Sequence, residues 1–244
     1  AEMPVVRIGF DRAADIHVVG CEYLADGTAL AVNTPAGPMR FNSSLLGRPN
    51  VYNIMAATGA ALSLGMEPEA IRAGVEQLAG VPGRIERIDE GQDFLVLVDY
   101  AHSPDSLENL LATAGLLPHN RIIVVFGCGG NRDWKKRPMM GEIAARLSDM
   151  AIVTSDNPRN EEPLGIIEEI EAGMKNGRAS CHREPDRRAA IDRAIAEARK
   201  NDVVLIAGKG HEDYQILGDR TIRFDDRMTA RECIRRRLKA ENGR

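Results

Sequence analysis

The chain has 244 residues, of which 43% are hydrophobic and 28% charged. This composition is typical of a globular protein with one large or two ordinary domains. The formal net charge of −4, with basic residues scattered along the chain, argues against a protein that binds nucleic acid. The one basic cluster, Arg235-Arg236-Arg237, is interpreted as the solvent-exposed face of a last helix.

The four cysteines, Cys21, Cys128, Cys181 and Cys233, are far apart and form no C-x-x-C pair. They indicate neither a zinc site nor a disulfide framework, and a reducing cytosol suits them best. No apolar run approaches the roughly 20 residues of a membrane span, and the first residues lack the pattern of a signal peptide. We therefore expect a cytoplasmic protein without a membrane partner.

The first 41 residues predict strands and hairpins. Short alternating segments such as Ile16–Gly20 and Ala29–Val32 are broken by turn residues. Helical spacing of the apolar residues follows, first from Asn50 to about Leu64 and then from Pro68 to about Ala79. The segment Val81-Pro82-Gly83 then interrupts the pattern.

Beyond this break the sequence alternates between predicted strands and predicted helices. The strands are expected at Phe94–Tyr100, Arg121–Gly127, Met150–Thr154 and Val203–Ala207, with helices beginning near Asp105, Pro138, Leu164 and Asp186. Such alternation predicts an α/β fold with a parallel sheet, right-handed crossovers and helices on both faces. We expect a domain boundary near residues 82–90.

Each of the four predicted strands ends in a loop of small and polar residues. The loops are Asp99–Pro104, Gly127–Asp133, Asp156–Arg159 and Gly208–Asp213. Because parallel strands all point one way, the loops are expected to gather at one edge of the sheet, where open α/β sheets bind ligands. Arg132 and Arg159 can each hold a carboxylate with two hydrogen bonds, and Glu212 can pair with an ammonium group. The sequence thus predicts a ligand that carries both charges.

Each loop taken alone also has a purely structural interpretation. Gly127–Gly130 could be an ordinary turn, and the third glycine of a dinucleotide fingerprint is missing, so a Rossmann cofactor site is disfavoured. His102 alone is more often a hydrogen-bonded loop histidine than a catalytic base. Asp156 and Asn157 could simply cap a turn before Pro158. The coincidence of all four loops favours the ligand site.

Four separated motifs carry a resemblance to a known family. They are Gly83-Arg84-Ile85-Glu86, Asp99-Tyr100-Ala101-His102-Ser103-Pro104-Asp105, Asp156-Asn157-Pro158-Arg159 and Gly208-Lys209-Gly210-His211-Glu212-Asp213-Tyr214-Gln215. These motifs, in this order, resemble those of the Mur ligases, and the resemblance covers essentially the whole chain. It implies that residues 84–244 form a Rossmann-like C-terminal domain with a mostly parallel sheet. Residues 1–83 would be the C-terminal part of a central ATP-binding domain.

The resemblance implies an acid–amino-acid ligase of peptidoglycan synthesis. Such an enzyme converts ATP to ADP and phosphate, uses Mg²⁺, and joins an amino acid to UDP-MurNAc-L-Ala-D-Glu through an acyl phosphate. The Asp-Asn-Pro-Arg motif is similar to that of the members that add meso-diaminopimelate. In those members the arginine, here Arg159, grips the distal carboxylate with help from Arg132, while Gly208 and Glu212 meet the distal amino group. The implied substrate site comprises Arg132, Asp156, Asn157, Arg159, Gly208 and Glu212.

The resemblance also implies a set of nucleotide-binding residues. They are Asn50, Asn53, Arg84, Asp99, His102 and Lys136. The two asparagines would lie near the adenine, Arg84 would contact a phosphate and Asp99 the ribose, while Lys136 and Arg137 match basic positions facing the cleft. Asn50 could instead simply cap its helix.

One departure from the family limits what can be expected of this chain. The phosphate loop G-x-x-x-x-G-K-[ST] is missing from the sequence, and the family's magnesium-binding glutamate and carbamylated lysine belong to segments that it does not include. We therefore expect a fragment of a longer enzyme, without catalytic or metal-binding residues of its own and inactive alone. Residues 1–80 are expected to pack poorly. Two alternatives are a binding module without turnover and a related ligase with another amino-acid or peptide substrate.

Overall fold

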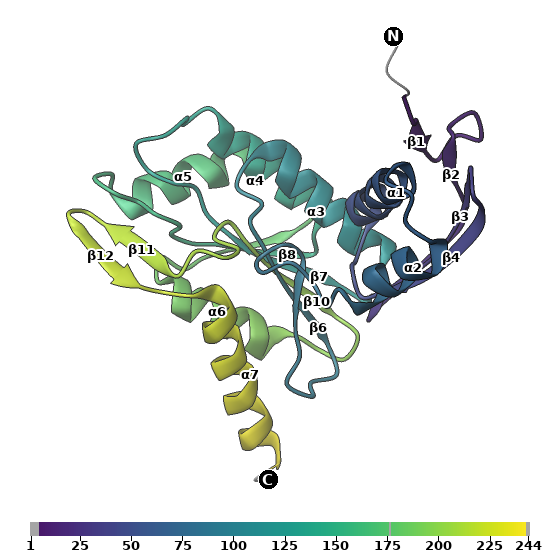
Figure 1. Ribbon diagram of the computed structural model, residues 1–244. Helices are drawn as coiled ribbons and strands as arrows, with labels where there is room; N and C mark the ends of the chain where they lie inside the picture. The colour runs from purple at the N-terminus through teal and green to yellow at the C-terminus, as the bar shows by residue number, and fades with distance from the viewer. Residues whose placement is uncertain (1–4, 176, 243–244) are drawn as a thin grey trace. The chain divides into compact units, whose positions relative to one another are not determined.

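The computed structural model describes residues 5–175 and 177–242. Contacts between Cα atoms divide the chain into two compact units, the first made of residues 1–80 and 116–118 and the second of residues 81–115 and 119–244. Each unit has its own sheet and its own helices (Figure 1).

The first unit combines a mainly antiparallel sheet with two helices. Its elements are β1 (Ile8–Gly9), β2 (Ile16–Leu24), β3 (Gly27–Thr34), β4 (Gly37–Ser43), α1 (Arg48–Ser63) and α2 (Pro68–Gln77). Strands β2, β3 and β4 pair antiparallel in sequence order, and β1 adds a short parallel edge. The two predicted strands and both predicted helices are present. The unpredicted β4 alternates buried Met39, Phe41 and Ser43 with exposed neighbours.

This unit has a hydrophobic core of its own. Ile16, Val32 and Phe41 of the sheet pack with Val51 and Met55 of α1, and all five side chains are buried. This core does not agree with the expectation that residues 1–80 pack poorly. The physical reason is that the antiparallel sheet and the two helices bury one another's apolar faces without needing a parallel sheet.

The second unit contains the predicted parallel sheet. Its strands are β5 (Glu86–Ile88), β6 (Leu95–Asp99), β7 (Ile122–Phe126), β8 (Met150–Val153), β9 (Ser180–Arg183) and β10 (Val203–Ala207). They lie in the order β5-β6-β10-β7-β8-β9, with every neighbouring pair parallel except β5 and β6. The prediction of a mostly parallel α/β sheet is confirmed. The short strands β5 and β9 were not predicted.

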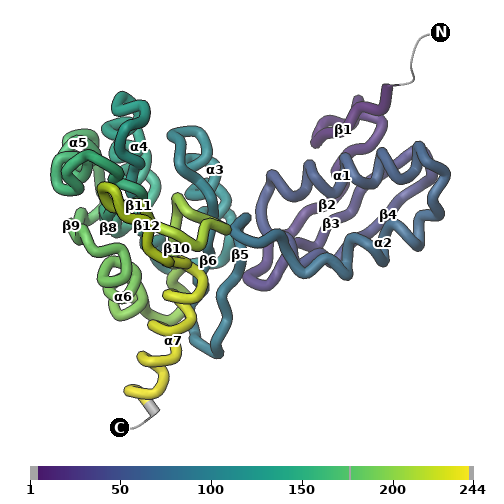
Figure 2. Tube along the Cα trace, turned by 60° about the vertical axis from the view of Figure 1, so that its left-hand side comes forward, coloured from purple at the N-terminus to yellow at the C-terminus, as the bar shows by residue number. Residues whose placement is uncertain are grey.

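Helices cover both faces of this sheet. They are α3 (Pro104–Leu116), α4 (Lys136–Leu147), α5 (Pro163–Met174), α6 (Arg187–Glu197) and α7 (Asp226–Asn242). Figures 1 and 2 show α3, α4 and α5 on one side of the sheet and α6 and α7 on the other. Val125 and Ile206 at the centre of the sheet pack with Ile191 of α6 and Ile234 of α7, and all four are fully buried. This core fixes the strand ends on which the site is built.

A hairpin and the end of α7 complete the unit. The hairpin consists of β11 (Tyr214–Leu217) and β12 (Arg220–Arg223) and was not predicted. The basic cluster does lie on the last helix, but its arginines are paired: Arg235 with Glu90, Arg236 with Asp192 and Arg237 with Glu241. Within residues 5–175 and 177–242, the helices fall short of the length and apolar character that a membrane crossing requires.

Candidate functional site

The carboxyl ends of β6, β7, β8 and β10 meet at one edge of the sheet, because these strands are parallel and adjacent. A cavity of about 500 Å³ opens there. Its lining contains all six residues predicted for the amino-acid substrate and two of those predicted for the nucleotide. The lining residues are Tyr100, His102, Gly129, Arg132, Asp133, Lys136, Asp156, Asn157, Arg159, Gly208, Glu212 and Tyr214.

The loops after β7 and β8 are joined by hydrogen bonds. The backbone N–H of Gly130 donates to the carbonyl oxygen of Asn157 at 2.9 Å, and that of Asn160 donates to Oδ1 of Asn131 at 3.1 Å. The carboxylate of Glu161 accepts from the backbone N–H of Asn131, and this bond is the main reason why the pKa of Glu161 lies below its ordinary value. The two loops are therefore fixed to each other, and together they carry both arginines that were predicted to bind a carboxylate.

Arg137 supports this pair of loops from behind. Its side chain is 2% exposed and makes ion pairs with Glu161 at 2.8 Å and Glu169 at 3.0 Å. Its guanidinium also donates to the carbonyl oxygen of Gly129 at 3.4 Å. The expectation that Arg137 faces the cleft is wrong, because the first turn of α4 directs the side chain into the protein.

Arg159 adopts a left-handed backbone conformation with φ at 53°. Its backbone N–H donates to the carbonyl oxygen of Ile216 at 3.1 Å, and its carbonyl oxygen accepts from the N–H of Gly218 at 2.7 Å, so the β11–β12 hairpin fixes the residue. Nη1 donates to the carbonyl oxygen of Gly130 at 2.9 Å. Among the described residues, Nε and Nη2 have no hydrogen-bond partner, which leaves a fork of donors for a carboxylate ligand. Arg132 is exposed at the rim.

Two carboxylates, Asp156 and Glu212, also line the cavity and form its acidic wall. The side-chain amide of Asn157 donates from Nδ2 to Oε2 of Glu212 at 3.2 Å and accepts at Oδ1 from the backbone N–H of Ile216 at 3.0 Å. Asn157 therefore links the strand-end loop to the hairpin instead of capping its own turn. Sequence reasoning missed Lys209, which lies beneath this wall. Its flanking glycines were the only available signal, because a lysine is almost always exposed.

Asp99 and Arg84 make contacts within the protein near the end of β6. Asp99 is buried, and its two carboxylate oxygens accept from the backbone N–H groups of Ile85 at 2.8 Å and Ala101 at 2.7 Å. Burial raises the pKa of Asp99 above its ordinary value, although both hydrogen bonds oppose the rise. The Arg84 guanidinium lies 5.1 Å from the ring centre of Tyr100. Neither side chain lines the cavity.

The other predicted nucleotide residues divide between the two units. Lys136 donates from Nζ to the carbonyl oxygen of His102 at 2.7 Å, and His102 is held by a 2.8 Å contact between Nδ1 and the Tyr100 carbonyl oxygen. Asn50 and Asn53 lie inside α1 in the first unit, where Nδ2 of Asn53 donates to Oδ1 of Asn50 at 3.0 Å. Asn50 is not a helix cap, because the N-cap of α1 is Gly47.

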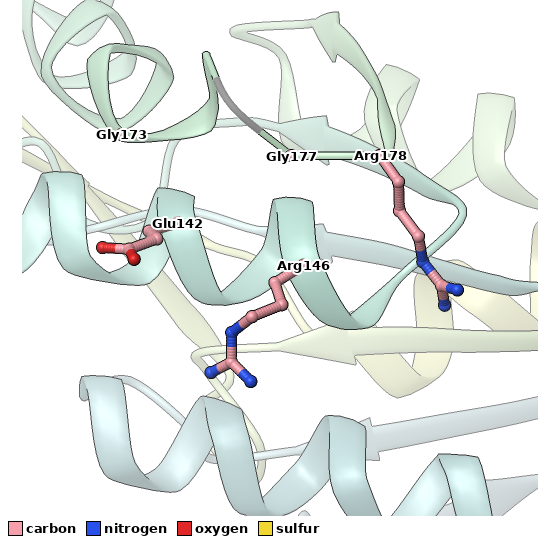
Figure 3. Close-up of a pocket in the computed structure, with 5 residues that line it drawn as sticks. All are labelled: Glu142, Arg146, Gly173, Gly177 and Arg178. Atoms are coloured by element: carbon pink, nitrogen blue, oxygen red, sulfur yellow. The ribbon is translucent and has the colours of Figure 1, made fainter.

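A second cavity lies beside α4 and contains no comparable set of groups (Figure 3). It is lined by Glu142, Arg146, Gly173, Gly177 and Arg178. The two guanidinium groups do not converge on a common point in Figure 3, and they pair instead with Glu108 at 2.6 Å and Asp149 at 3.9 Å. Across residues 5–175 and 177–242, no three His, Cys, Asp or Glu side chains gather into a set that could hold a metal ion. The edge cavity is the best candidate site.

Comparisons with known proteins identify a family for the second unit and relatives that match nearly the whole chain. A family model described as "Mur ligase, glutamate ligase domain" matches residues 83–210, which include β6, β7, β8 and β10. Two curated relatives are named UDP-N-acetylmuramoyl-L-alanyl-D-glutamate--2,6-diaminopimelate ligase. The one from Geobacillus thermodenitrificans is 46% identical over 96% of this chain and 48% of its own length. The one from Gloeobacter violaceus is 50% identical over 93% of this chain and 47% of its own length.

Solved structures of Mur ligases are also similar to this chain. A structure of a UDP-N-acetylmuramoyl-L-alanyl-D-glutamate--2,6-diaminopimelate ligase is 37% identical with a TM-score of 0.71, and the match covers 93% of this chain and 47% of that chain. The UDP-N-acetylmuramate-alanine ligase MurC from Thermotoga maritima shares the fold at 20% identity, with a TM-score of 0.68 over 96% of this chain and 48% of that chain. The chain thus spans about half the length of the curated relatives it matches.

Proposed function

This chain belongs to the Mur ligase family, and on that premise we propose that it forms part of an ATP-dependent ligase that joins meso-diaminopimelate to UDP-MurNAc-L-Ala-D-Glu in peptidoglycan synthesis. In the proposed reaction, ATP converts the glutamate carboxyl group to an acyl phosphate, and an amine of diaminopimelate displaces phosphate to form the amide. Residues 84–244 are proposed as the domain that binds and orients the amine substrate. Residues 1–83 are proposed as part of the ATP-binding domain.

The observation that carries the proposal is that positively and negatively charged side chains line the same cavity. Arg132 and Arg159 reach it from the loops after β7 and β8, and Asp156 and Glu212 reach it from the loops after β8 and β10. The distal end of meso-diaminopimelate carries one carboxylate and one ammonium on the same carbon. A guanidinium fork and an adjacent carboxylate suit that pair of groups.

The same geometry supports selection against lysine. Lysine has a distal ammonium but no distal carboxylate, so its binding would leave the Arg159 donors without an acceptor. A partly buried charged donor left unpaired costs about 2–3 kcal/mol, which corresponds to more than a tenfold preference for diaminopimelate. Other amino acids and peptides without this distal pair are disfavoured for the same reason.

The nucleotide side of the proposal rests on fewer contacts. Arg84 and Lys136 supply positive charge suited to phosphate, the backbone carbonyl oxygen of His102 accepts a hydrogen bond from Lys136, and Asp99 holds the loop through the backbone. Asn50 and Asn53 are proposed as adenine contacts of the first unit.

Mg²⁺ would accompany ATP, but the described residues contain no suitable ligand set, so we assign it no residue of this chain. The four cysteines of the chain are free, and we place the protein in the cytoplasm, where ATP is available.

Calorimetric titration of the chain with meso-diaminopimelate, with L-lysine as the comparison ligand, tests the proposal. The single tryptophan, Trp134, is 61% exposed and lies between the cavity residues Asp133 and Lys136, so its fluorescence gives a second readout. We expect diaminopimelate to bind at least tenfold more tightly than lysine, Arg159→Ala to remove this preference, and Arg146→Ala, which deletes an arginine outside the cavity, to leave it intact. Equal affinity for the two ligands in the wild-type chain would refute the assignment.

A further inference from the structure

The loop after β10 contains a lysine with no exposed side-chain surface, Lys209. Its neighbours Gly208 and Gly210 have φ angles of 122° and 55°, a backbone conformation that L-residues rarely adopt. The two glycines turn the backbone so that the lysine side chain enters the protein beneath the cavity instead of reaching solvent. A buried ammonium is expensive unless it is paired and fully hydrogen-bonded.

The partners of this ammonium all line the cavity. Nζ of Lys209 lies 3.0 Å from Oδ1 of Asn157, 3.4 Å from Oε2 of Glu212 and 3.5 Å from Oδ1 of Asp156. The three N–H groups of an ammonium can serve three acceptors at once. The ring of Tyr214, with its centre 5.6 Å from Nζ, provides a further contact.

These contacts determine which way the amide of Asn157 faces. Its Oδ1 receives two donors, Nζ of Lys209 and the backbone N–H of Ile216, so its Nδ2 is directed at Oε2 of Glu212. Oε2 is occupied by Asn157 and Lys209, whereas the other oxygen of Glu212, Oε1, has a single hydrogen-bond partner among the described residues, the hydroxyl of Tyr100 at 3.5 Å. Oε1 is therefore the oxygen of Glu212 that is available to a ligand.

The ammonium also sets the charge of the acidic wall. Asp156 and Glu212 together carry two negative charges, and Lys209 cancels one of them. The nearby buried pair of Arg187 and Asp226 is neutral overall. The single remaining negative charge matches a ligand group with a single positive charge.

We propose that Lys209 is a positioning residue of the amino-acid pocket, whose buried ammonium holds Asn157 and Glu212 in the arrangement that receives the distal ammonium of the substrate. This inference rests on the proposed function, because it assigns the distal amino group to the acidic wall. It extends that function by identifying a residue that does not touch the ligand. Without Lys209, Asp156 and Glu212 repel each other and the amide of Asn157 loses one of its two fixing donors.

A comparison of two ligands separates this role from a general contribution to folding. L-2-aminopimelate lacks only the distal amino group of meso-diaminopimelate. In calorimetric titrations we expect Lys209→Met to weaken diaminopimelate binding by tenfold or more and aminopimelate binding by less than about threefold, so that the two affinities converge. Lys209→Arg, which keeps the charge, is expected to retain part of the preference. Lys200→Met, which removes an exposed lysine, is the control and is expected to bind both ligands as the wild type does.

A measurement on the wild-type chain covers the case in which Lys209→Met does not fold. The side-chain ammonium of a buried, hydrogen-bonded lysine gives a resolved ¹⁵N–¹H signal, which we expect diaminopimelate to shift and aminopimelate to leave nearly unchanged. Equal losses for both ligands in the variant, or equal shifts in the wild type, would overturn the role of Lys209 alone. Failure of the wild-type chain to bind diaminopimelate at all would overturn the proposed function, and this inference with it.

Discussion

Gly129 leaves the space that the guanidinium of Arg159 occupies: a Cβ added at Gly129 would lie 2.9 Å from Nη1 of Arg159. Glycine is required at the next position, Gly130, for a different reason. A Cβ at Gly130 would lie 1.8 Å from the carbonyl oxygen of Pro158, which belongs to the backbone and cannot move aside. Gly129 thus leaves room for a side chain of the site, whereas Gly130 allows two backbone segments to approach each other.

Gly129→Ala is therefore expected to weaken binding without unfolding the protein. The added methyl group meets the end of a flexible side chain, so Arg159 shifts and loses its alignment with a ligand carboxylate. We expect about a tenfold loss of diaminopimelate affinity and a change of less than about 1 kcal/mol in the free energy of unfolding. Titration calorimetry measures the affinity, and urea denaturation measures the free energy of unfolding.

Gly130→Ala is the comparison and is expected to destabilise the fold by at least about 2 kcal/mol. Unchanged affinity in Gly129→Ala would show that the position of Nη1 does not matter.

At position 159 the backbone conformation favours glycine for stability, whereas ligand binding requires the arginine side chain. The φ of Arg159, 53°, costs an L-residue about 1–2 kcal/mol, and only glycine avoids that cost. Arg159→Ala and Arg159→Gly both remove the guanidinium, so both should lose diaminopimelate binding. Arg159→Gly, however, should be more stable than Arg159→Ala by about 1 kcal/mol. Urea denaturation of the two variants decides the point, and an alanine variant as stable as the glycine variant would contradict it.

The sheet and the edge cavity could be predicted from sequence because both depend on local pattern. The continuous apolar runs Ile122–Phe126 and Val203–Ala207 are typical of strands buried on both faces. Once these strands are parallel, the polar segments that follow them must meet. For this reason six residues from separate loops, among them Arg132 and Glu212, could be placed in one cavity before the structure was known.

The supporting layer could not be predicted, since it depends on contacts between residues distant in sequence. Lys209 and Arg137 are buried against the usual preference of their residue types, and only the partners supplied by folding make that burial tolerable. All four residues of the short strand Arg220–Arg223 are exposed, and Ile222 is its one apolar residue, so the strand has no pattern of alternating burial to detect. Its neighbour Ile216 nevertheless fixes Arg159 through the backbone.

Glu161 predicts a dependence of stability on pH. Its pKa is lowered by the hydrogen bond from the backbone N–H of Asn131 and by the ion pair with Arg137. A carboxyl group with a lowered folded-state pKa stabilises the protein above its unfolded pKa, near 4.5, and this contribution is lost as the pH falls through the folded pKa. Glu161→Gln should cost about 1 kcal/mol at pH 7 once screening by solvent is allowed for.

The difference in unfolding free energy between wild type and Glu161→Gln should shrink steadily below about pH 4.5. Urea denaturation at pH 7 and at pH 3.5 measures this change. Glu162→Gln, at an adjacent exposed position, serves as the control and should show no comparable change. A difference that stayed constant with pH would mean that the charge of Glu161 does not stabilise the loop.

The last prediction concerns the buried ion pair behind the cavity. Arg187 and Asp226 have no exposed side-chain surface and are 2.7 Å apart, and Nη2 of Arg187 also donates to the carbonyl oxygen of Ala207 at 3.0 Å. Removing one partner leaves an uncompensated buried charge, so Asp226→Leu or Arg187→Met should each cost about 3–5 kcal/mol of stability. The double variant Arg187→Met/Asp226→Leu removes both charges and should cost clearly less than the sum of the single changes. Urea denaturation of the complete double-mutant cycle measures the coupling energy. Additive losses would show that the two side chains are stabilised independently, by backbone contacts such as the one to Ala207 and not by each other.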